Sequence, residues 1–313
     1  MKEPLIVLSG PTAVGKTQLS INLAKAVNGS IISADSAQVY RYMDIGSAKI
    51  RPEEMQGVKH YLIDVLDPSV PFDVVTFQKM AKEAMQEIRA EGKIPIIVGG
   101  TGFYIQAVLN DICFEEEGGD KEYRHSLEKL ATENGDALYE KLKECDPASA
   151  ESIHPNNQKR VIRALEFYHE NGYPISEHNA QQKERSSPYQ FAYFVLNQDR
   201  KILYERIEKR VDLMMEEGFL DEVRFLKEKG YERSLVSMQA LGYKQLLAYL
   251  DGEYSLEEAI YIIKRDTRHF AKRQLTWFRR EKDMIFLDKG EFTSEDQILE
   301  KMLEILKEEK IYE

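Results

Sequence analysis

The feature that most constrains this chain is an eight-residue segment near its start, GPTAVGKT, which fits the pattern G-x-x-x-x-G-K-[ST] in full. It follows an apolar run at residues 5–8 and comprises Gly10, Pro11, Thr12, Ala13, Val14, Gly15, Lys16 and Thr17. The glycines let successive backbone N–H groups surround an anion, the lysine adds a positive charge, and the threonine hydroxyl can bind Mg²⁺. A helix over residues 18–28 would direct its positive end at the same anion. The pattern predicts a P-loop, a strand–loop–helix unit that binds phosphate groups.

Further apolar runs predict the strands of a parallel sheet. Most of them are continuous rather than alternating, and they occupy residues 5–8, 30–34, 61–66, 94–98, 191–196 and 284–287. Continuous runs are typical of strands that helices cover on both faces. Between two of these runs, Phe77, Ala81, Ala84 and Ile88 recur at helical spacing, and Gly92 stands where a helix end is expected. We therefore predict an α/β fold, with a doubly wound parallel sheet of the P-loop NTPase-like kind.

Strand signals stop after residue 115, and helical periodicity then runs to about Gly172. An acidic, glycine-containing segment at residues 115–120 precedes this stretch, and a polar segment at residues 181–188 closes it. These joints predict an all-helical domain, residues 115–188, inserted into a core made of residues 1–114 and 189–313.

One helix of the predicted insertion combines an apolar stripe with a basic face. Its apolar stripe includes Val161 and Leu165, so that Lys159, Arg160 and Arg163 lie largely off the buried face. These basic residues are therefore available to a partner.

Composition narrows the possible function classes. The chain has 313 residues, enough for one large domain or two ordinary ones. Its 43 Lys and Arg against 54 Asp and Glu give a net charge of -11, which weighs against a nucleic-acid partner if the charge is spread evenly. Cys113 and Cys145 match neither a disulfide framework nor a metal motif, which fits a cytoplasmic protein. No apolar run approaches the roughly 18 residues of a membrane span, so we expect no membrane partner; a monomer is the default expectation.

Two further segments follow predicted strands at the edge where open α/β sheets bind ligands. Asp35 comes after the second strand and is a candidate general base, a candidate Mg²⁺ ligand or a residue that only forms a turn. Thr101 lies among Gly99, Gly100 and Gly102 after the fourth strand, where many P-loop enzymes carry an acidic residue. The glycines allow close approach of a ligand anion, although such a cluster is also typical of an ordinary tight turn.

The C-terminal part contains a strongly basic segment at residues 264–280, with seven basic residues, one acidic residue and a formal charge of +6. Interleaved His269, Phe270, Trp277 and Phe278 could stack on unpaired RNA bases. The alternative is that the aromatic residues belong to the core and the basic residues form a solvated face.

These segments together resemble one family, the tRNA dimethylallyltransferases, also called tRNA isopentenyltransferases. The resemblance spans nearly the whole chain and rests on six segments in the family's order, residues 10–17, 35–40, 99–102, 159–166, 238–244 and 271–279. The chain is similar to the bacterial form, because it lacks the cysteines of the zinc-finger segment that eukaryotic relatives carry at their C-terminus.

The resemblance implies that the P-loop binds the diphosphate of dimethylallyl diphosphate, and that the acceptor is N6 of the adenine just 3′ of the anticodon. It implies three catalytic residues: Asp35 as the general base, Lys16 on the departing diphosphate, and Thr101 near both the diphosphate and the tRNA. Mg²⁺ on Thr17 is the expected cofactor, and Arg210 is expected to reach the diphosphate.

The resemblance also implies that the tRNA anticodon stem-loop contacts several segments and that the inserted domain clamps it. With the basic segment added, the predicted tRNA-binding residues are Asp35, Ser36, Ala37, Gln38, Thr101, Arg124, Lys159, Arg160, Val161, Ile162, Arg163, Lys244, Arg268 and Arg273. The target base must leave its stack to reach the site, as in other base-modifying enzymes.

Three alternatives keep the P-loop but change the chemistry. An adenylate isopentenyltransferase would share the P-loop and Asp35 but has no need for a basic clamp. A small-molecule or nucleotide kinase would fit the same sheet, although the missing acidic residue after the fourth strand counts against it. An RNA-binding NTPase without transfer chemistry would instead hydrolyse ATP in the presence of RNA.

Overall fold

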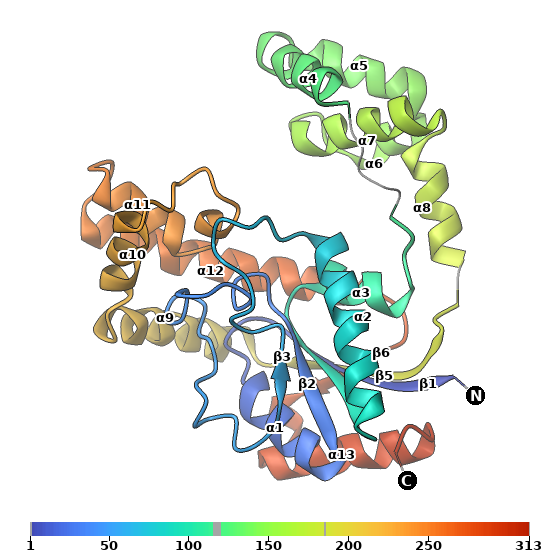
Figure 1. Ribbon diagram of the computed structural model, residues 1–313, viewed down its shortest axis with the longest axis vertical. Coiled ribbons are helices and arrows are strands. Elements are labelled where there is room, and N and C mark those ends of the chain that lie inside the picture. The colour runs from blue at the N-terminus through green and yellow to red at the C-terminus, as the bar shows by residue number, and fades with distance from the viewer. Residues whose placement is uncertain (1, 115–119, 185, 313) are drawn as a thin grey trace. The chain divides into compact units, whose positions relative to one another are not determined.

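A computed structural model describes residues 2–114, 120–184 and 186–312 of this protein. The chain divides into two compact units, one formed by Met1–Leu109 with Pro188–Glu313 and the other by Asn110–Ser187 (Figure 1). The sequence-based limits of the insertion, residues 115 and 188, lie close to those of this division. Most of the predicted acidic joint, residues 115–119, and residue 185 of the predicted polar joint fall outside the described residues.

The first unit contains a sheet of six parallel strands, which confirms the predicted α/β class. The strands run in the order β3-β2-β4-β1-β5-β6, so the P-loop strand β1 lies between β4 and β5. Their bounds are β1 Glu3–Ser9, β2 Gly29–Ala34, β3 His60–Tyr61, β4 Ile94–Gly99, β5 Tyr189–Asn197 and β6 Met284–Asp288.

The predicted strand at residues 61–66 is wrong over most of its length, because β3 covers only His60–Tyr61. Leu62 and Asp64 adopt φ angles of 62° and 57°, which an extended strand does not allow. Only an isolated bridge joins Leu66 to Tyr40 beyond the strand.

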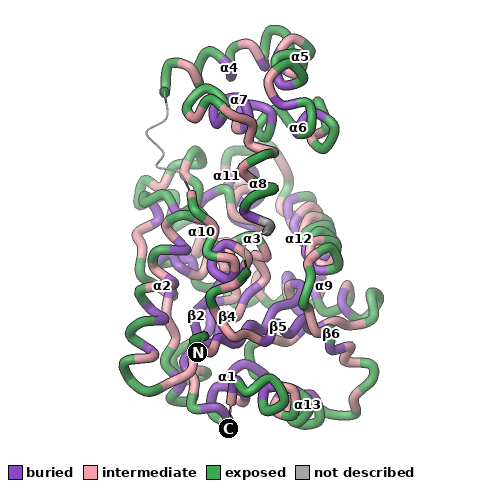
Figure 2. Tube along the Cα trace, turned by 90° about the vertical axis from the view of Figure 1, so that its right-hand side faces the viewer, coloured by how far each residue is buried: buried purple, intermediate pink, exposed green. Residues whose placement is uncertain are grey.

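Helices cover both faces of the sheet, as the continuous apolar runs predict. Leu5 and Val7 of β1 face one core and Ile6 and Leu8 the other, and all four are fully buried. Helices α1 and α13 lie on the second face, and most of the others lie on the first (Figures 1 and 2). The helices of this unit are α1 Lys16–Ala26, α2 Val74–Ala90, α3 Gly102–Leu109, α9 Arg200–Glu216, α10 Phe219–Glu228, α11 Tyr243–Leu250, α12 Leu256–Phe278 and α13 Glu295–Glu308, with short 3-10 turns η1 Ser237–Gln239 and η2 Lys289–Glu291.

All regular elements described in the second unit are helices. They are α4 Lys121–Glu133, α5 Gly135–Cys145, α6 Pro147–Ser152, α7 Gln158–Asn171 and α8 Ile175–Glu184. Gly172 ends α7 with a φ of 74°, at the residue where the helical periodicity stops. Leu138, Leu142 and Val161 are buried in a core of this unit's own.

None of the described helices combines the length and the apolar composition that crossing a membrane requires.

Candidate active site

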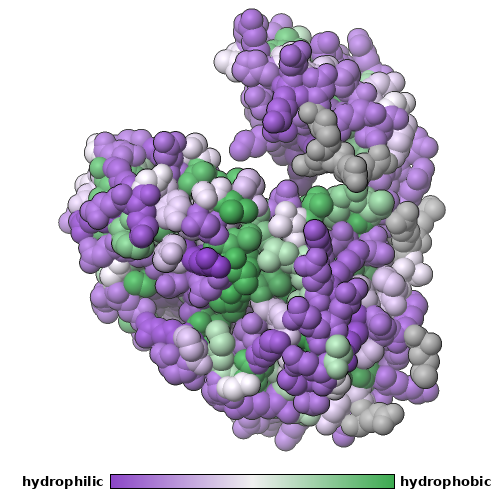
Figure 3. All heavy atoms as spheres, viewed as in Figure 1, coloured by the Kyte–Doolittle hydropathy of each residue, from purple (hydrophilic) through white to green (hydrophobic). Residues whose placement is uncertain are grey.

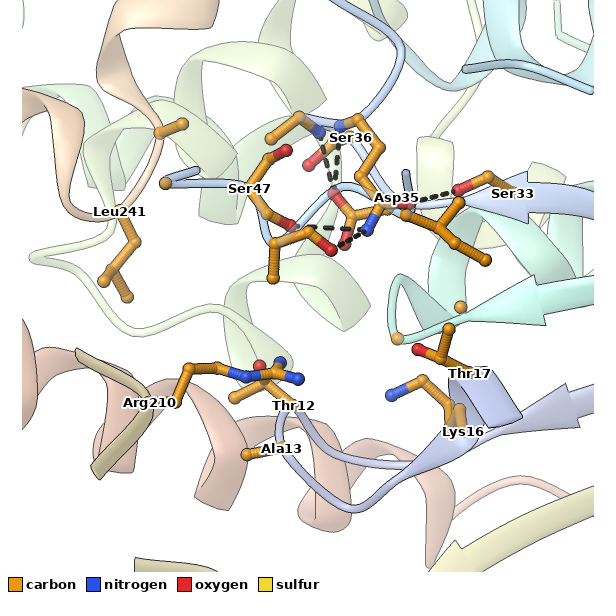
Figure 4. Close-up of a pocket in the computed structure, with 18 of the residues that line it drawn as sticks. Thr12, Ala13, Lys16, Thr17, Ser33, Asp35, Ser36, Ser47, Arg210 and Leu241 are labelled. Atoms are coloured by element: carbon orange, nitrogen blue, oxygen red, sulfur yellow. Dashed lines mark hydrogen bonds between the residues drawn. The ribbon is translucent and has the colours of Figure 1, made fainter. Parts of the chain in front are cut away.

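A cavity of about 320 Å³ lies at the carboxyl-terminal edge of the sheet in the first unit. Three loops that follow neighbouring strands line it: the P-loop after β1, the segment that begins at Asp35 after β2, and Gly100 and Thr101 after β4. Further parts of the wall come from helices α9, α10 and α12, from the segment at residues 46–50 and from the loop at residues 240–242. Figure 4 shows Lys16, Thr17, Asp35 and Arg210 around this space. The sheet topology therefore brings together the loops that the sequence singled out.

The P-loop is shaped by its two glycines. Gly10 has a φ of 146°, and a side chain there would meet the carbonyl oxygen of Leu196 at 2.6 Å. Gly15 has a φ of 98° and precedes α1, so its left-handed backbone turns the chain into the helix. Lys16 bends back over the loop, and its ammonium group donates to the carbonyl oxygens of Gly10 and Pro11, both at 2.9 Å. The loop therefore presents a helix N-terminus and a lysine to the same space.

Two positively charged side chains, Lys16 and Arg210, line the P-loop end of the cavity. Burial of the ammonium group, together with the positive charge of Arg210, lowers the pKa of Lys16 to about 8, while the negative charge of Asp35 opposes this shift. Burial also lowers the pKa of Arg210, and repulsion from Arg206 acts in the same direction. Across the described residues, no acidic side chain forms an ion pair with Lys16 or Arg210. Two charges held together in this way favour the binding of an anion between them.

Asp35 lies at the end of β2 and forms a turn while still facing the cavity. Its Oδ1 accepts hydrogen bonds from the backbone N–H groups of Ala37 at 2.9 Å and Gln38 at 3.4 Å. Asp35 therefore forms a turn, as one of the three interpretations predicts. The same hydrogen bonds fix the position of its carboxylate, so the turn does not exclude a chemical role. Asp35 also lines the cavity with Lys16, and its Oδ2 accepts no hydrogen bond from the residues that the structure describes.

Gln38, predicted to contact tRNA, organises the loop that follows Asp35. Its amide nitrogen donates to the carbonyl oxygens of Ser47 and Ala48, both at 3.3 Å, and its amide oxygen accepts from Ser33 at 3.0 Å. The side chain thus joins two segments of the cavity wall. Ser36, Ala37 and Gln38 line the cavity beside Asp35.

Gln274 on α12 joins the P-loop to the glycine loop, and the sequence did not single it out. Its amide oxygen accepts from the backbone N–H of Thr12, and its amide nitrogen donates to the carbonyl oxygen of Gly100, both at 2.9 Å. A side chain at Gly100 would collide with that amide, which explains the glycine beside Thr101. Gln274 lies within the segment 271–279, but the pattern of residues in that segment did not predict this contact.

The cavity has residues that fit a magnesium ion arriving with a phosphate ligand. No cluster of three or more His, Cys, Asp or Glu side chains in the described ranges could hold a metal ion by itself. Thr17 and Asp35 nevertheless line the same cavity and offer oxygen ligands. Mg²⁺ is commonly held by one or two protein oxygens while phosphate oxygens and waters complete its shell.

The second unit carries five residues of the predicted tRNA-binding segment on α7. Lys159 and Arg160 are exposed and Arg163 is half-buried. Val161 and Ile162 are buried, at 0% and 6% exposure, because they belong to the core of this unit. Their side chains are therefore not exposed to a partner, and tRNA binding at these two positions stays a prediction.

Arg124, the other predicted tRNA contact in this unit, forms two ion pairs. Its guanidinium donates to Glu128 at 3.0 Å and to Glu166 at 3.2 Å. Its side chain is still 55% exposed, so it remains accessible at the surface of α4.

The basic segment of α12 separates into two parts. Lys264 and Arg268 pair with Asp212 and Glu208 of α9, each at 2.6 Å. Lys272 and Arg273, further along α12, are exposed. A second cavity, of about 430 Å³, lies beside them and is lined by His269, Lys272, Arg273, Thr276, Trp277 and Arg280.

The aromatic residues of α12 also divide. Phe278 is fully buried, as the core alternative predicts, whereas Phe270 is 38% exposed and contacts the guanidinium of Arg273. Figure 3 shows apolar side chains gathered in a hollow on the face that carries α12. Lys244, at the start of α11, is half-buried and is not among the residues that line either cavity.

Comparisons with known proteins agree with one another. A model of the IPP transferase family matches residues 38–281. A tRNA dimethylallyltransferase from Lachnoclostridium phytofermentans is 62% identical over 310 residues, which cover 99% of each chain. The crystal structure of a tRNA isopentenylpyrophosphate transferase from Bacillus halodurans has 44% identity and a TM-score of 0.74, covering 99% of this chain and 98% of that one. A eukaryotic dimethylallyltransferase acting on tRNA has 32% identity and a TM-score of 0.79, covering 91% and 74%. This chain belongs to the IPP transferase family.

Proposed function

We propose that this protein transfers the dimethylallyl group of dimethylallyl diphosphate to N6 of the adenine immediately 3′ of the anticodon in tRNA. One observation carries the proposal: Lys16 and Arg210, which form no ion pair with an acidic side chain in the described part of the chain, share a cavity with the carboxylate of Asp35. The relatives named above as tRNA dimethylallyltransferases and tRNA isopentenylpyrophosphate transferases support the same activity.

The phosphate end of the cavity is suited to a diphosphate leaving group. When the allylic C1–O bond breaks, the electron pair and the negative charge stay on the diphosphate. Backbone N–H groups of the P-loop, Lys16 and Arg210 are placed to stabilise that charge. Thr17, with Asp35 nearby, would hold a Mg²⁺ ion, which supplies further positive charge to the diphosphate.

Asp35 is placed to act on the acceptor. The exocyclic amine of adenine is a weak nucleophile and must lose a proton as the N–C bond forms. A carboxylate fixed by the N–H groups of Ala37 and Gln38 can accept that proton from a base within hydrogen-bond distance. Thr101, across the same cavity, offers a hydroxyl to either substrate.

Two exposed basic surfaces support tRNA as the acceptor. Lys159 and Arg160 lie on α7 of the second unit, and Lys272 and Arg273 lie on α12 of the first. Phosphate contacts from such residues position an RNA without reading its sequence. An adenylate prenyltransferase would have no use for either surface, whereas a carboxylate such as Asp35 would suit the acceptor of a kinase as well.

Labelled dimethylallyl diphosphate tests the proposal when purified protein is incubated with Mg²⁺ and, in separate reactions, unmodified tRNA and AMP. A parallel reaction contains labelled ATP and no prenyl donor. We expect label in tRNA alone. Label in AMP but not in tRNA would make the protein an adenylate prenyltransferase, and phosphoryl transfer from ATP without prenyl transfer would make it a kinase.

A further inference from the structure

The end of the cavity away from the P-loop is apolar and has a fixed wall. Met214, Phe219 and Leu241 line it, and Leu241 lies across the cavity from Lys16 and Thr17 in Figure 4. The total volume, about 320 Å³, is near the lower limit for small-molecule sites. A substrate bound by its diphosphate at the P-loop would therefore extend its hydrocarbon chain into a short apolar space.

Phe219 supports the wall of this space from behind and packs against two glycines from separate loops. A side chain at Gly46 would collide with its ring, and one at Gly242 would meet it at 2.8 Å. Tyr243 packs against the same ring, with centroids 5.0 Å apart and an interplanar angle of 77°. Phe219 is 1% exposed, so its ring has no room to swing away from the cavity.

Glu222, one turn further along α10, secures the same wall. Its carboxylate accepts from the backbone N–H groups of Asp44, Ile45 and Gly46, at 2.8, 2.7 and 3.1 Å. It also accepts from the hydroxyl of Tyr243 at 2.7 Å. The first turn of α10 therefore ties both loops around Phe219 into one rigid unit.

We propose that Phe219 sets the length of prenyl chain that this enzyme accepts, limiting the donor to five carbons. The inference rests on the proposed function. A ten-carbon donor anchored by its diphosphate would drive its second isoprene unit against the wall at Gly46 and Gly242, and the Phe219 ring packed behind them leaves that wall no room to yield. The chemistry is otherwise unchanged: the C1–O bond breaks with its electron pair on the diphosphate, N6–C1 forms, and the N6 proton passes to Asp35.

The test measures kcat/KM for geranyl diphosphate and for dimethylallyl diphosphate with the same tRNA, in the wild-type protein and in Phe219→Ala. We expect the geranyl-to-dimethylallyl ratio to rise by at least about tenfold in the variant, the smallest effect typical of a methylene-sized change in an apolar pocket. Mass analysis of the nucleosides would show the longer chain on adenine. An unchanged ratio in a folded variant would overturn the inference.

Phe225→Ala is the matched control, because it makes the same truncation on the same helix. Phe225 is 42% exposed and packs against Tyr42, away from the cavity wall. Its donor ratio should equal that of the wild type, and an equal rise in both variants would refute the role of Phe219.

Phe219→Leu keeps the test valid if the alanine variant unfolds, because leucine retains most of the buried volume. It should shift the ratio in the same direction by a few fold, and no shift in the folded leucine variant would count against the inference. Dimethylallyl transfer by the wild-type protein tests the proposed function separately. No transfer by the wild-type protein would contradict the proposed function, whereas an unchanged donor ratio in the Phe219 variants would contradict only the inference about chain length.

Discussion

The two ends of the cavity are built in different ways. The phosphate end comes largely from one contiguous segment, residues 10–17, and recognises charge through backbone N–H groups and Lys16. The apolar end is assembled from α10 and the loops around Gly46 and Gly242, which are far apart in the chain. Anion binding can therefore be specified by a short motif, whereas the shape of the apolar end depends on long-range packing.

If this contrast is correct, changes at the polar end should slow the reaction or weaken substrate binding, whereas changes at the apolar end should alter the choice of donor.

Asp35→Asn should have the largest effect. Asparagine keeps an oxygen that can accept from the N–H of Ala37, but it cannot take a proton. We expect kcat to fall by on the order of a hundredfold or more, with tRNA affinity nearly unchanged. Single-turnover kinetics measure the first quantity and filter binding the second; full turnover in this variant would rule out Asp35 as the base.

Lys16→Met should weaken the binding of inorganic pyrophosphate by on the order of tenfold to a hundredfold, since a charged hydrogen-bond donor is lost. The pH dependence gives a second test. Free Lys16 loses its proton near its pKa of about 8, and a bound anion favours the protonated form. Affinity should therefore fall as the pH rises above about 8, with uptake of a proton on binding.

Calorimetry at several pH values checks this prediction, and Lys16→Met provides the control for the ligand's own titration. The decline above pH 8 should be shallower in that variant. Identical profiles in the two proteins would remove Lys16 from the binding site.

Gln274→Leu should have a smaller effect. It leaves the N–H of Thr12 and the carbonyl of Gly100 without their partner, which loosens the P-loop against the glycine loop. We expect KM for the prenyl donor to rise by about tenfold with little change in kcat. A wild-type KM in the leucine variant would contradict the bridging role.

The smallest effect concerns the two parts of the basic segment on α12. Replacing Lys272 and Arg273 by alanine should reduce the salt dependence of tRNA binding by about two units of slope. Replacing Lys264 and Arg268 is the matched control, because Asp212 and Glu208 already neutralise them. Equal changes in both double variants would show that the ion pairs do not decide which residues bind RNA.

The sequence predicts the parts of this site that depend on local geometry and strand order. The P-loop, Asp35 and Thr101 follow neighbouring strands, so a parallel sheet must bring them to one edge. Gln274 and Phe219 could not be predicted in the same way. The contacts of Gln274 with Thr12 and Gly100, and of Phe219 with Gly46, join residues more than 150 positions apart in the chain, which no periodicity records.

The errors also have physical causes. Val161 lies on the apolar stripe that its own helix periodicity predicts, so its side chain is buried in the core of the second unit. The charge of +6 counted over residues 264–280 overstates the free charge, because Lys264 and Arg268 are paired with α9. The third strand is short because left-handed residues interrupt an apolar run.

The most direct measurement maps where the prenyl group is attached. A tRNA with adenine 3′ of the anticodon is incubated with dimethylallyl diphosphate and the wild-type protein, beside the same tRNA with guanine at that position. Guanine lacks the N6 amine, so we expect one prenylated nucleoside in the first tRNA and none in the second. Equal prenylation of both tRNAs, or of neither, would contradict it.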